Sequence, residues 1–272
     1  MPHDTEHRAA IGAITIVEFE AGQAVRHFFG TRGQPADVRV PFGETAACRD
    51  GSRPVPRAVV SVKQVHGTDA LLVKRPIEAG SVFLGQWDAV VTNQPGVLVT
   101  VRTADCVPIL LHDPVEHVVA AIHSGWRGSV AGIVPKTVMR MQEEFGSQVH
   151  HIRMAIGPSA GSCCYEVHDA VLKPLQSYPF WKSVVRETTY GRALLDLREF
   201  VRCQSHAAGV PAENVWTASH CTICRPDLFF SYRREGVVKE TMTSGIMLSA
   251  ATDEPVGSPA EAVRSKKAGL AR

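Results

Sequence analysis

The sequence predicts a single mixed α/β domain in which sheets pack against one another as well as against helices. Short apolar runs typical of strands outnumber stretches with helical spacing, and the two kinds do not alternate strictly along the chain. The composition suits one sizeable core, because 44% of the 272 residues are hydrophobic and 21% are charged. We therefore expect one domain over residues 1–251.

Strand signals dominate the first half of the chain. A long segment rich in Gly, Pro and Arg, residues 30–57, has little periodicity and predicts an irregular loop. The runs 97–101 and 107–111 are apolar and β-branched, which favours buried strands on either side of a polar crossing. Strand-like patterns lie at residues 13–19, 57–65, 70–73, 86–93, 97–101, 107–111 and 118–123.

Helical spacing enters in the second half. We expect helices over residues 129–145, 167–176 and 196–208, with Pro135 marking a late start or a kink in the first. Later strands are expected at residues 153–157, 215–218, 229–232 and 245–250. From residue 252 the chain is dominated by Asp, Glu, Pro, Gly, Ser, Lys and Ala, so 252–272 is expected to be a disordered tail.

Charge and composition argue against several classes of protein. The formal net charge is +2 and the 29 basic residues are scattered, unlike the basic stripe of a nucleic-acid binder. Residues 1–10 lack the apolar core of a signal peptide, and no apolar run approaches the roughly 18 residues of a membrane span. The seven cysteines are an odd number and include an adjacent pair, so we expect mostly free thiols in a soluble, cytoplasmic protein.

Three residues with good zinc-binding side chains lie at the ends of predicted strands: His66, Cys106 and His123. Their spacings of 40 and 17 residues match no compact zinc finger and agree with ligands delivered by separate strands. Either histidine alone would most often be held by hydrogen bonds, and a lone cysteine would most often be a small buried apolar residue. The three residues together leave both a metal site and these alternatives open.

One thiolate and two imidazoles leave the fourth tetrahedral position of zinc open, which is typical of catalytic sites and favours hydrolysis or deamination. Asp105, beside Cys106, is a candidate partner of the ligands or a general base, although an aspartate between two strands is as often a turn residue. Without metal, Cys106 can instead be a nucleophile with His123 as its base.

Candidate anion-binding residues surround these positions. Arg127 follows a strand at a strand-to-helix turn, where it either holds a phosphate or covers Trp126. Lys63 and Arg32 are weaker candidates. The pair Cys221 and Cys224 has the spacing of a zinc or redox motif, but a second such pair is missing, and the adjacent Cys163-Cys164 favours packing or pocket lining.

The sequence resembles the multicopper polyphenol oxidoreductase (laccase-domain) family, also described as the purine nucleoside phosphorylase family. The resemblance covers roughly residues 12–250, and its motifs follow the family's order. They are Lys63-Gln-Val-His-Gly67, Asp88-Ala-Val-Val-Thr92, Thr103-Ala-Asp-Cys-Val-Pro-Ile-Leu110, Ile122-His-Ser-Gly-Trp-Arg-Gly128, Ile156-Gly-Pro158, Cys164-Tyr-Glu-Val167, Cys221-Thr and Phe229-Phe-Ser-Tyr-Arg-Arg234.

The resemblance implies a layered α/β/β/α sandwich with zinc held by His66, Cys106 and His123. It implies phosphorolysis of adenosine, inosine, guanosine and methylthioadenosine, and deamination of adenosine. The family's laccase name implies copper, and bacterial relatives are linked to editing of peptidoglycan precursors. Two segments depart from the family pattern: Gln-Pro-Ala follows Gly33, and Glu stands for Asp in Arg234-Glu-Gly236. We expect both of these segments to influence which substrate is preferred.

Other functions are open to the same residues. A copper oxidase of phenols normally has His-x-His spacings, which this chain lacks. A cysteine hydrolase built on Cys106, or a binding protein without turnover, would use the same pocket. The leading expectation is an enzyme that binds purine nucleosides and phosphate and works as a monomer.

Overall fold

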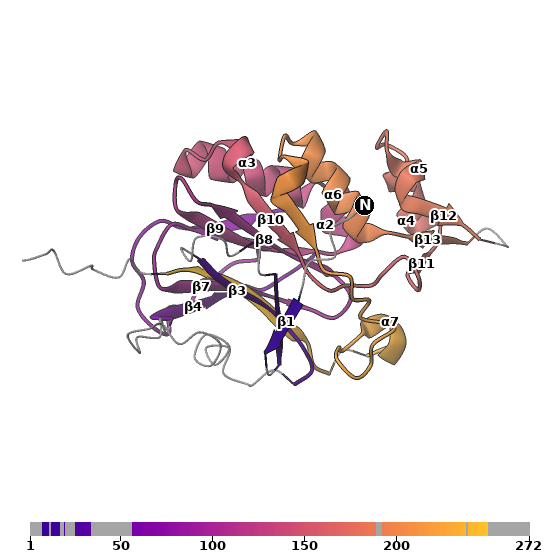
Figure 1. Ribbon diagram of the computed structural model, residues 1–272, viewed down its shortest axis with the longest axis horizontal. Helices are drawn as coiled ribbons and strands as arrows, with labels where there is room; N and C mark the ends of the chain where they lie inside the picture. The colour runs from indigo at the N-terminus through magenta and orange to yellow at the C-terminus, as the bar shows by residue number, and fades with distance from the viewer. Residues whose placement is uncertain are drawn as a thin grey trace, which may run out of the picture.

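The computed structural model describes residues 7–10, 12–16, 19, 25–33, 56–188, 192–237 and 239–249. Two six-stranded sheets dominate it (Figure 1). The first sheet has the order β1 (His7–Ala10), β2 (Ala13–Ile16), β3 (Val25–Gly30), β15 (Met242–Leu248), β7 (Val97–Thr103), β4 (Ala58–Ser61). The second has the order β14 (Val215–Thr217), β10 (Arg153–Ile156), β8 (Val107–Asp113), β9 (Val118–Ser124), β6 (Ala89–Thr92), β5 (Ala70–Val73).

Both sheets are mixed. The pairs β4/β7, β5/β6 and β10/β14 are parallel, and the other pairs are antiparallel. A small third sheet joins β11 (Glu166–Val167), β13 (Ala193–Leu195) and β12 (Val185–Glu187). The six described helices are α2 (Trp126–Val130), α3 (Ile133–Phe145), α4 (Asp169–Leu175), α5 (Trp181–Val184), α6 (Leu197–Ala207) and α7 (Tyr232–Glu235).

The central strands of the second sheet are buried on both faces, which explains their long apolar runs. Along β8, Ile109 and Leu111 pack toward the helices, whereas Leu110 between them packs toward the first sheet. Strand β9 divides in the same way, with Ile122 on the helix side and Ala121 on the sheet side. Because strand side chains alternate between faces, a strand covered on both sides needs apolar residues on both of its faces, and its buried polar residues need partners.

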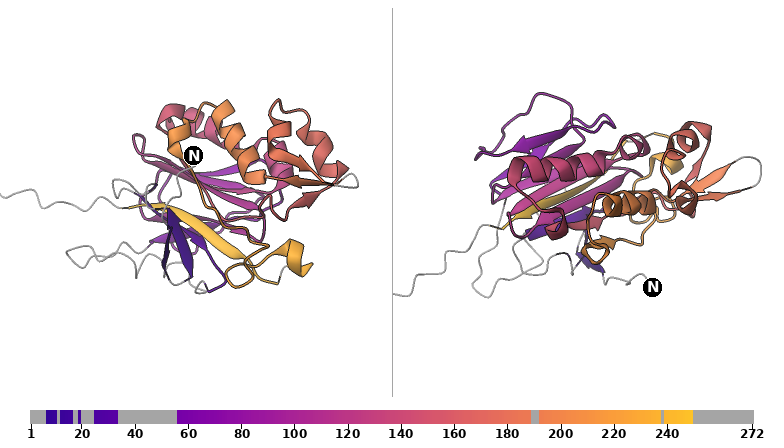
Figure 2. Two further views of the ribbon diagram at one scale, coloured as in Figure 1. Left: turned by 45° about the vertical axis from the view of Figure 1, so that its right-hand side comes forward. Right: turned by 90° about the horizontal axis from the view of Figure 1, so that it is seen from above.

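The layers follow from these two cores. Helices α3 and α6 lie across the outer face of the second sheet, and the first sheet packs against its inner face (Figure 2). The prediction of a mixed α/β fold with packed sheets is confirmed. Among the described residues no helix covers the outer face of the first sheet, and α7 lies beyond one end of its strand β15. No helix in the described ranges is long and apolar enough to cross a membrane.

Some element boundaries differ from expectation for identifiable reasons. The helix expected over 129–145 is two helices, because Gly132 adopts a left-handed φ of 83° between α2 and α3. Pro135 lies in the first turn of α3, where a missing N–H is tolerated.

The strand expected at 229–232 is wrong. The Ser231 side chain accepts a hydrogen bond from the Arg234 N–H and begins helix α7 instead. The tail at 252–272 and most of the loop at 34–55 lie outside the described residues.

Candidate metal centre and its pocket

The structure brings His66, Cys106 and His123 together. Cys106 immediately precedes β8 and His123 lies in β9, and the antiparallel register of these strands places Val107 opposite Ser124. His66 comes from the loop that follows β4. The three ligand atoms lie within 4.8 Å of one another, with 3.7 Å between Cys106 Sγ and His66 Nε2. Strand pairing therefore assembles a donor set that the sequence spreads over 58 positions.

Asp88, the residue before β6, holds two of these ligands in place. Its fully buried carboxylate accepts a hydrogen bond from His123 Nδ1 at 2.7 Å. The same carboxylate accepts the backbone N–H groups of His66 at 2.9 Å and Gly67 at 2.6 Å. The Nδ1 contact leaves His123 Nε2 to face the cluster, and the backbone contacts fix the loop that carries His66.

Electrostatics favours charge separation within the cluster. Burial raises the pKa of Cys106, but hydrogen bonds with His123 and His66 outweigh it and lower the pKa to about 7. Burial lowers the pKa of His123, yet hydrogen bonds with Asp88 and Cys106 raise it to about 9. Burial likewise opposes ionisation of Asp88, and the His123 contact and backbone N–H groups hold its pKa below the usual value. The same negative groups that stabilise a positive charge on His123 would also stabilise a cation bound among the three ligands.

Backbone geometry around the cluster is unusual. His66 and Asp105 adopt positive φ values of 62° and 95°, which cost about 1–3 kcal/mol each for residues other than glycine. A Cβ added at Gly125 would lie 2.6 Å from His66 Cδ2 and 3.0 Å from Cys106 Sγ. Gly125 thus permits the β9–α2 turn to pass directly beside the ligands.

The donor set fits a metal ion. Thiolate and imidazole are the ligands of zinc sites, and three protein ligands leave one position open. The buried carboxylate on His123 is the partner commonly found behind a metal-bound imidazole. His66, Cys106 and His123 are therefore able to hold a metal ion.

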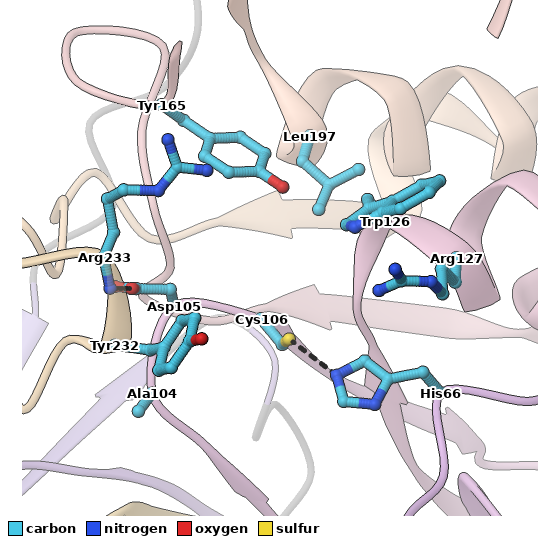
Figure 3. Close-up of a pocket in the computed structure, with 10 residues that line it drawn as sticks. All are labelled: His66, Ala104, Asp105, Cys106, Trp126, Arg127, Tyr165, Leu197, Tyr232 and Arg233. Atoms are coloured by element: carbon cyan, nitrogen blue, oxygen red, sulfur yellow. Dashed lines mark hydrogen bonds between the residues drawn. The ribbon is translucent and has the colours of Figure 1, made fainter. Parts of the chain in front are cut away.

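A cavity of about 180 Å³ opens above the cluster (Figure 3). Aromatic rings and two arginine side chains form much of its wall. The lining residues are His66, Ala104, Asp105, Cys106, Trp126, Arg127, Tyr165, Leu197, Tyr232 and Arg233. Burial raises the pKa of Tyr165 to about 12, so its hydroxyl stays neutral. Such a cavity offers stacking surfaces for a planar group and positive charge for an anion.

Only one of the three expected anion-binding residues lines the cavity. Arg127 does so, and its guanidinium stacks over Trp126 with 4.4 Å from Cζ to the ring centroid. Both roles weighed for it are thus compatible with the structure. Arg32 instead forms an ion pair with Glu235 at 2.9 Å and stacks on Phe230. Lys63 is exposed and is not among the lining residues.

Asp105 contacts the far wall of the cavity. Its Oδ1 accepts the Thr222 hydroxyl at 2.6 Å, and its Oδ2 accepts the Ser231 hydroxyl at 2.9 Å and the Arg233 N–H at 2.7 Å. Both oxygens are engaged, so the contacts support a positioning role. The general-base role stays a prediction.

Two important residues escaped the sequence analysis. Asp88 was noticed only within a motif, although a carboxylate that opens an otherwise apolar strand is a signal for a buried partner. Arg233 stands out in the sequence only as part of the motif that ends at Arg234, whereas helix α7 directs it toward the cavity, where its Cζ lies 5.1 Å from the Tyr165 ring centroid.

Comparison with known proteins identifies the family. The profile of the multi-copper polyphenol oxidoreductase laccase family matches residues 8–249. The chain belongs to this family. A family relative, the purine nucleoside phosphorylase of Bacteroides thetaiotaomicron, is 37% identical over 206 residues, which span 73% of this chain and 76% of the relative. The adenosine deaminase RL5 of an unknown prokaryotic organism is 41% identical over 161 residues, or 58% of this chain and 61% of RL5.

A solved structure supports the same assignment. The crystal structure of YlmD from Geobacillus stearothermophilus aligns with a TM-score of 0.76 and 29% identity, covering 92% of this chain and all of YlmD. The predicted resemblance is confirmed, and so is the prediction of an enzyme at the level of the family, whose relatives are named for enzymatic activities.

Proposed function

We propose that the protein is a zinc-dependent purine nucleoside phosphorylase that also deaminates adenosine. The observation that carries this proposal is one cavity that combines a His/Cys/His donor set, aromatic walls and Arg127. Relatives named purine nucleoside phosphorylase and adenosine deaminase support the substrate class. The expected nucleosides are adenosine, inosine, guanosine and methylthioadenosine.

The residues divide the work as follows. His66, Cys106 and His123 would hold the zinc ion, which when bound supplies Lewis-acid polarisation. Trp126, Tyr165 and Tyr232 would enclose the planar base, and Arg127 would bind phosphate.

In phosphorolysis a phosphate oxygen forms a bond to the sugar C1′ while the bond from C1′ to the base nitrogen breaks. Arg127 would orient the phosphate and balance its charge, which contributes through positioning and electrostatics.

A second candidate is favoured by the hydrogen bonds around Cys106. Asp88, His123 and Cys106 form a carboxylate–imidazole–thiol series, the arrangement of a cysteine hydrolase with His123 as base. Editing of a peptidoglycan precursor would fit such a hydrolase. Copper-dependent oxidation of phenols is supported by the family's description alone.

The candidates separate in one experiment on wild type and Cys106→Ala. We expect about one zinc ion at the His66 cluster, lost in the variant together with adenosine cleavage that requires phosphate. Phosphate-independent release of adenine would refute phosphorolysis. Covalent labelling of Cys106 that is indifferent to zinc, with activity retained in metal-free protein, would favour the cysteine hydrolase. Stoichiometric copper with phenol oxidation would favour the oxidase.

A further inference from the structure

Four cysteines gather on the surface away from the His66 cluster. Cys163 and Cys164 lie in the loop between β10 and β11, and Cys221 and Cys224 lie between β14 and α7. Their four sulfur atoms lie within 4.8 Å of one another. Cys224 Sγ is 3.1 Å from Cys164 Sγ and 3.4 Å from Cys163 Sγ. Two loops that lie about 60 residues apart in the sequence therefore bring their cysteine side chains together.

Strand pairing brings the two loops together. Strands β10 and β14 are parallel neighbours, with Ile156 opposite Thr217. The pairing extends past their ends to a parallel bridge between Ser159 and Cys221, where the Thr222 N–H donates to the Ser159 carbonyl at 3.0 Å. The convergence of the cysteines is therefore built on the frame of the second sheet.

Tight turns then aim the sulfur atoms at one another. The Gly161 carbonyl accepts the N–H groups of Cys164 and Tyr165, which curls the loop so that both adjacent cysteines face the same side. A Cβ at Gly161 would lie 3.1 Å from the Cβ of Cys221 and 3.4 Å from Cys163 Sγ. Glycine at this position allows the loops to approach closely.

The sulfur spacing fits a bound metal better than a disulfide. The contacts of Cys224 with Cys163 and Cys164 exceed the roughly 2.05 Å of a disulfide bond, and all four cysteines are free. A tetrahedral zinc ion with Zn–S distances of about 2.3 Å separates its sulfur ligands by about 3.8 Å, which is within the observed spread. A disulfide would also leave two of the four thiols without a role, whereas a metal uses all of them.

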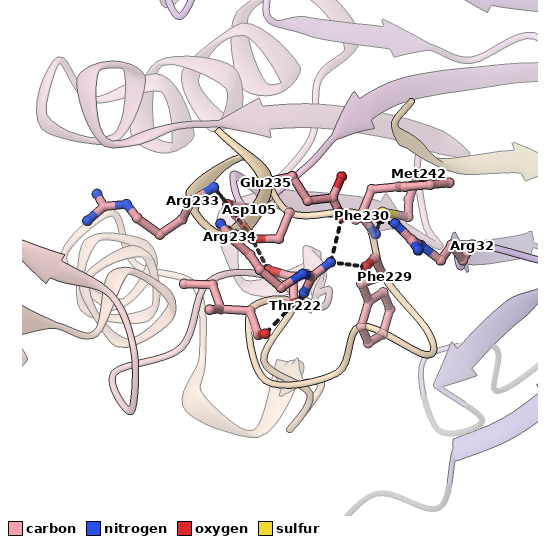
Figure 4. A network of polar contacts seen from close by, with 11 residues as sticks. Arg32, Asp105, Thr222, Phe229, Phe230, Arg233, Arg234, Glu235 and Met242 are labelled. Atoms are coloured by element: carbon pink, nitrogen blue, oxygen red, sulfur yellow. Dashed lines mark hydrogen bonds and ion pairs between the residues drawn. The ribbon is translucent and has the colours of Figure 1, made fainter. Parts of the chain in front are cut away.

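Backbone and side-chain donors reinforce the site. The Gly161 N–H donates to Cys221 Sγ at 3.2 Å, the kind of contact that stabilises a thiolate. Arg234 donates to the carbonyls of Thr222 and Ile223 at 2.8 and 3.0 Å, fixing the backbone between Cys221 and Cys224 (Figure 4).

The guanidinium of Arg198 donates to the carbonyls of Ala218 and His220, immediately before Cys221. It therefore fixes the backbone on the other side of Cys221, as Arg234 does between Cys221 and Cys224.

We propose that Cys163, Cys164, Cys221 and Cys224 form a second, structural metal site that takes zinc or another thiophilic divalent cation. On binding, the cation replaces the thiol protons, which pass to solvent. With four protein ligands the site is closed and has no position for substrate. This proposal does not depend on the reaction at the His66 cluster.

The site would also hold the wall of the cavity. Tyr165 directly follows Cys164, and the Arg233 guanidinium donates to the Glu166 carbonyl at 2.7 Å. On the other side, Thr222 in the second loop and Arg233 in α7 both donate to Asp105, which adjoins Cys106. A metal that fastens the two loops therefore restrains the residues that line the cavity opposite the His66 cluster.

Metal counting on purified protein tests the proposal. Wild type is expected to hold about two zinc ions per chain, and the double variant Cys164→Ser/Cys224→Ser about one. Cys203→Ser is the matched control, because this half-buried cysteine lies in α6 outside the cluster, and it is expected to keep both ions. An unchanged metal count in the double variant would overturn the proposal, as would a native disulfide among the four cysteines in peptide mapping.

A second measurement covers the case in which the double variant fails to fold. Cys106→Ala protein, with the first site disabled, is stripped of metal and titrated with Cd²⁺. Uptake of about one ion per chain, with four thiols protected from alkylation and thiolate-to-metal absorption in the ultraviolet, is the expected result. Failure to bind Cd²⁺, or binding without protection of these four thiols, would refute the site.

Discussion

Replacing Asp88 by Asn tests whether the buried carboxylate organises the metal centre. In the structure one oxygen accepts His123 Nδ1 and the His66 N–H, and the other accepts the Gly67 N–H. An amide has only one accepting oxygen. In either orientation its NH₂ group therefore faces at least one donor, and the negative charge opposite His123 is lost.

The hydrogen bonds that Asp88→Asn removes determine how much metal affinity and stability the variant should lose. Loss of a partner behind a metal-binding imidazole typically weakens metal affinity by about 10–100-fold, or about 1.4–2.7 kcal/mol. Each charge-assisted hydrogen bond lost also lowers the free energy of unfolding of the metal-free protein by about 1.5–3 kcal/mol. Chelator competition measures the first quantity and urea unfolding the second.

A matched control is available in the same segment. Asp69 is exposed, and we expect Asp69→Asn to change zinc affinity by less than about twofold. If Asp88→Asn binds zinc at the His66 cluster as tightly as wild type, while Cys106→Ala loses the zinc ion of that cluster, the inference that Asp88 positions the ligands is wrong.

Three further results are expected. Gly125→Ala should abolish zinc binding at the His66 cluster, because the new Cβ would lie 2.6 Å from the His66 ring; a zinc content equal to that of wild type, with activity retained, would contradict this. Arg127→Ala should raise the KM for phosphate about tenfold or more in steady-state kinetics, whereas Arg32→Ala, outside the cavity, should not; equal effects would remove the phosphate role of Arg127. Burial lowers the pKa of His112 to about 4, below its unfolded value of about 6.5, so the unfolded state takes up the proton first as pH falls. The free energy of unfolding should therefore drop by about 2 kcal/mol more in wild type than in His112→Leu between pH 7 and about pH 5, and parallel urea-unfolding profiles would contradict the assignment.

The strands that were predictable from sequence are those whose burial dictates composition. In β8 and β9 every residue is buried, so the apolar runs located both strands. Strands β12 and β13 have three residues each and form a small separate sheet with β11, and such short elements give no clear period. Helix α7 has no clear sequence signal, because its start depends on a single capping hydrogen bond that the Ser231 side chain accepts from the Arg234 N–H.

The two cysteine-containing clusters differ in what the sequence could reveal. The residue types at His66, Cys106 and His123 pointed to their chemistry, and the structure brings them together. By contrast, Cys163 and Cys224 were treated as separate features, because their proximity depends on the pairing of β10 with β14. Local sequence carries no signal for a contact between residues about 60 positions apart.

The most direct test of the proposed reaction follows isotopically labelled phosphate through adenosine cleavage by the zinc-loaded enzyme. We expect adenine and a labelled sugar 1-phosphate in equal amounts, with no cleavage when phosphate is omitted. Free ribose as the sugar product, formed at the same rate without phosphate, would contradict it.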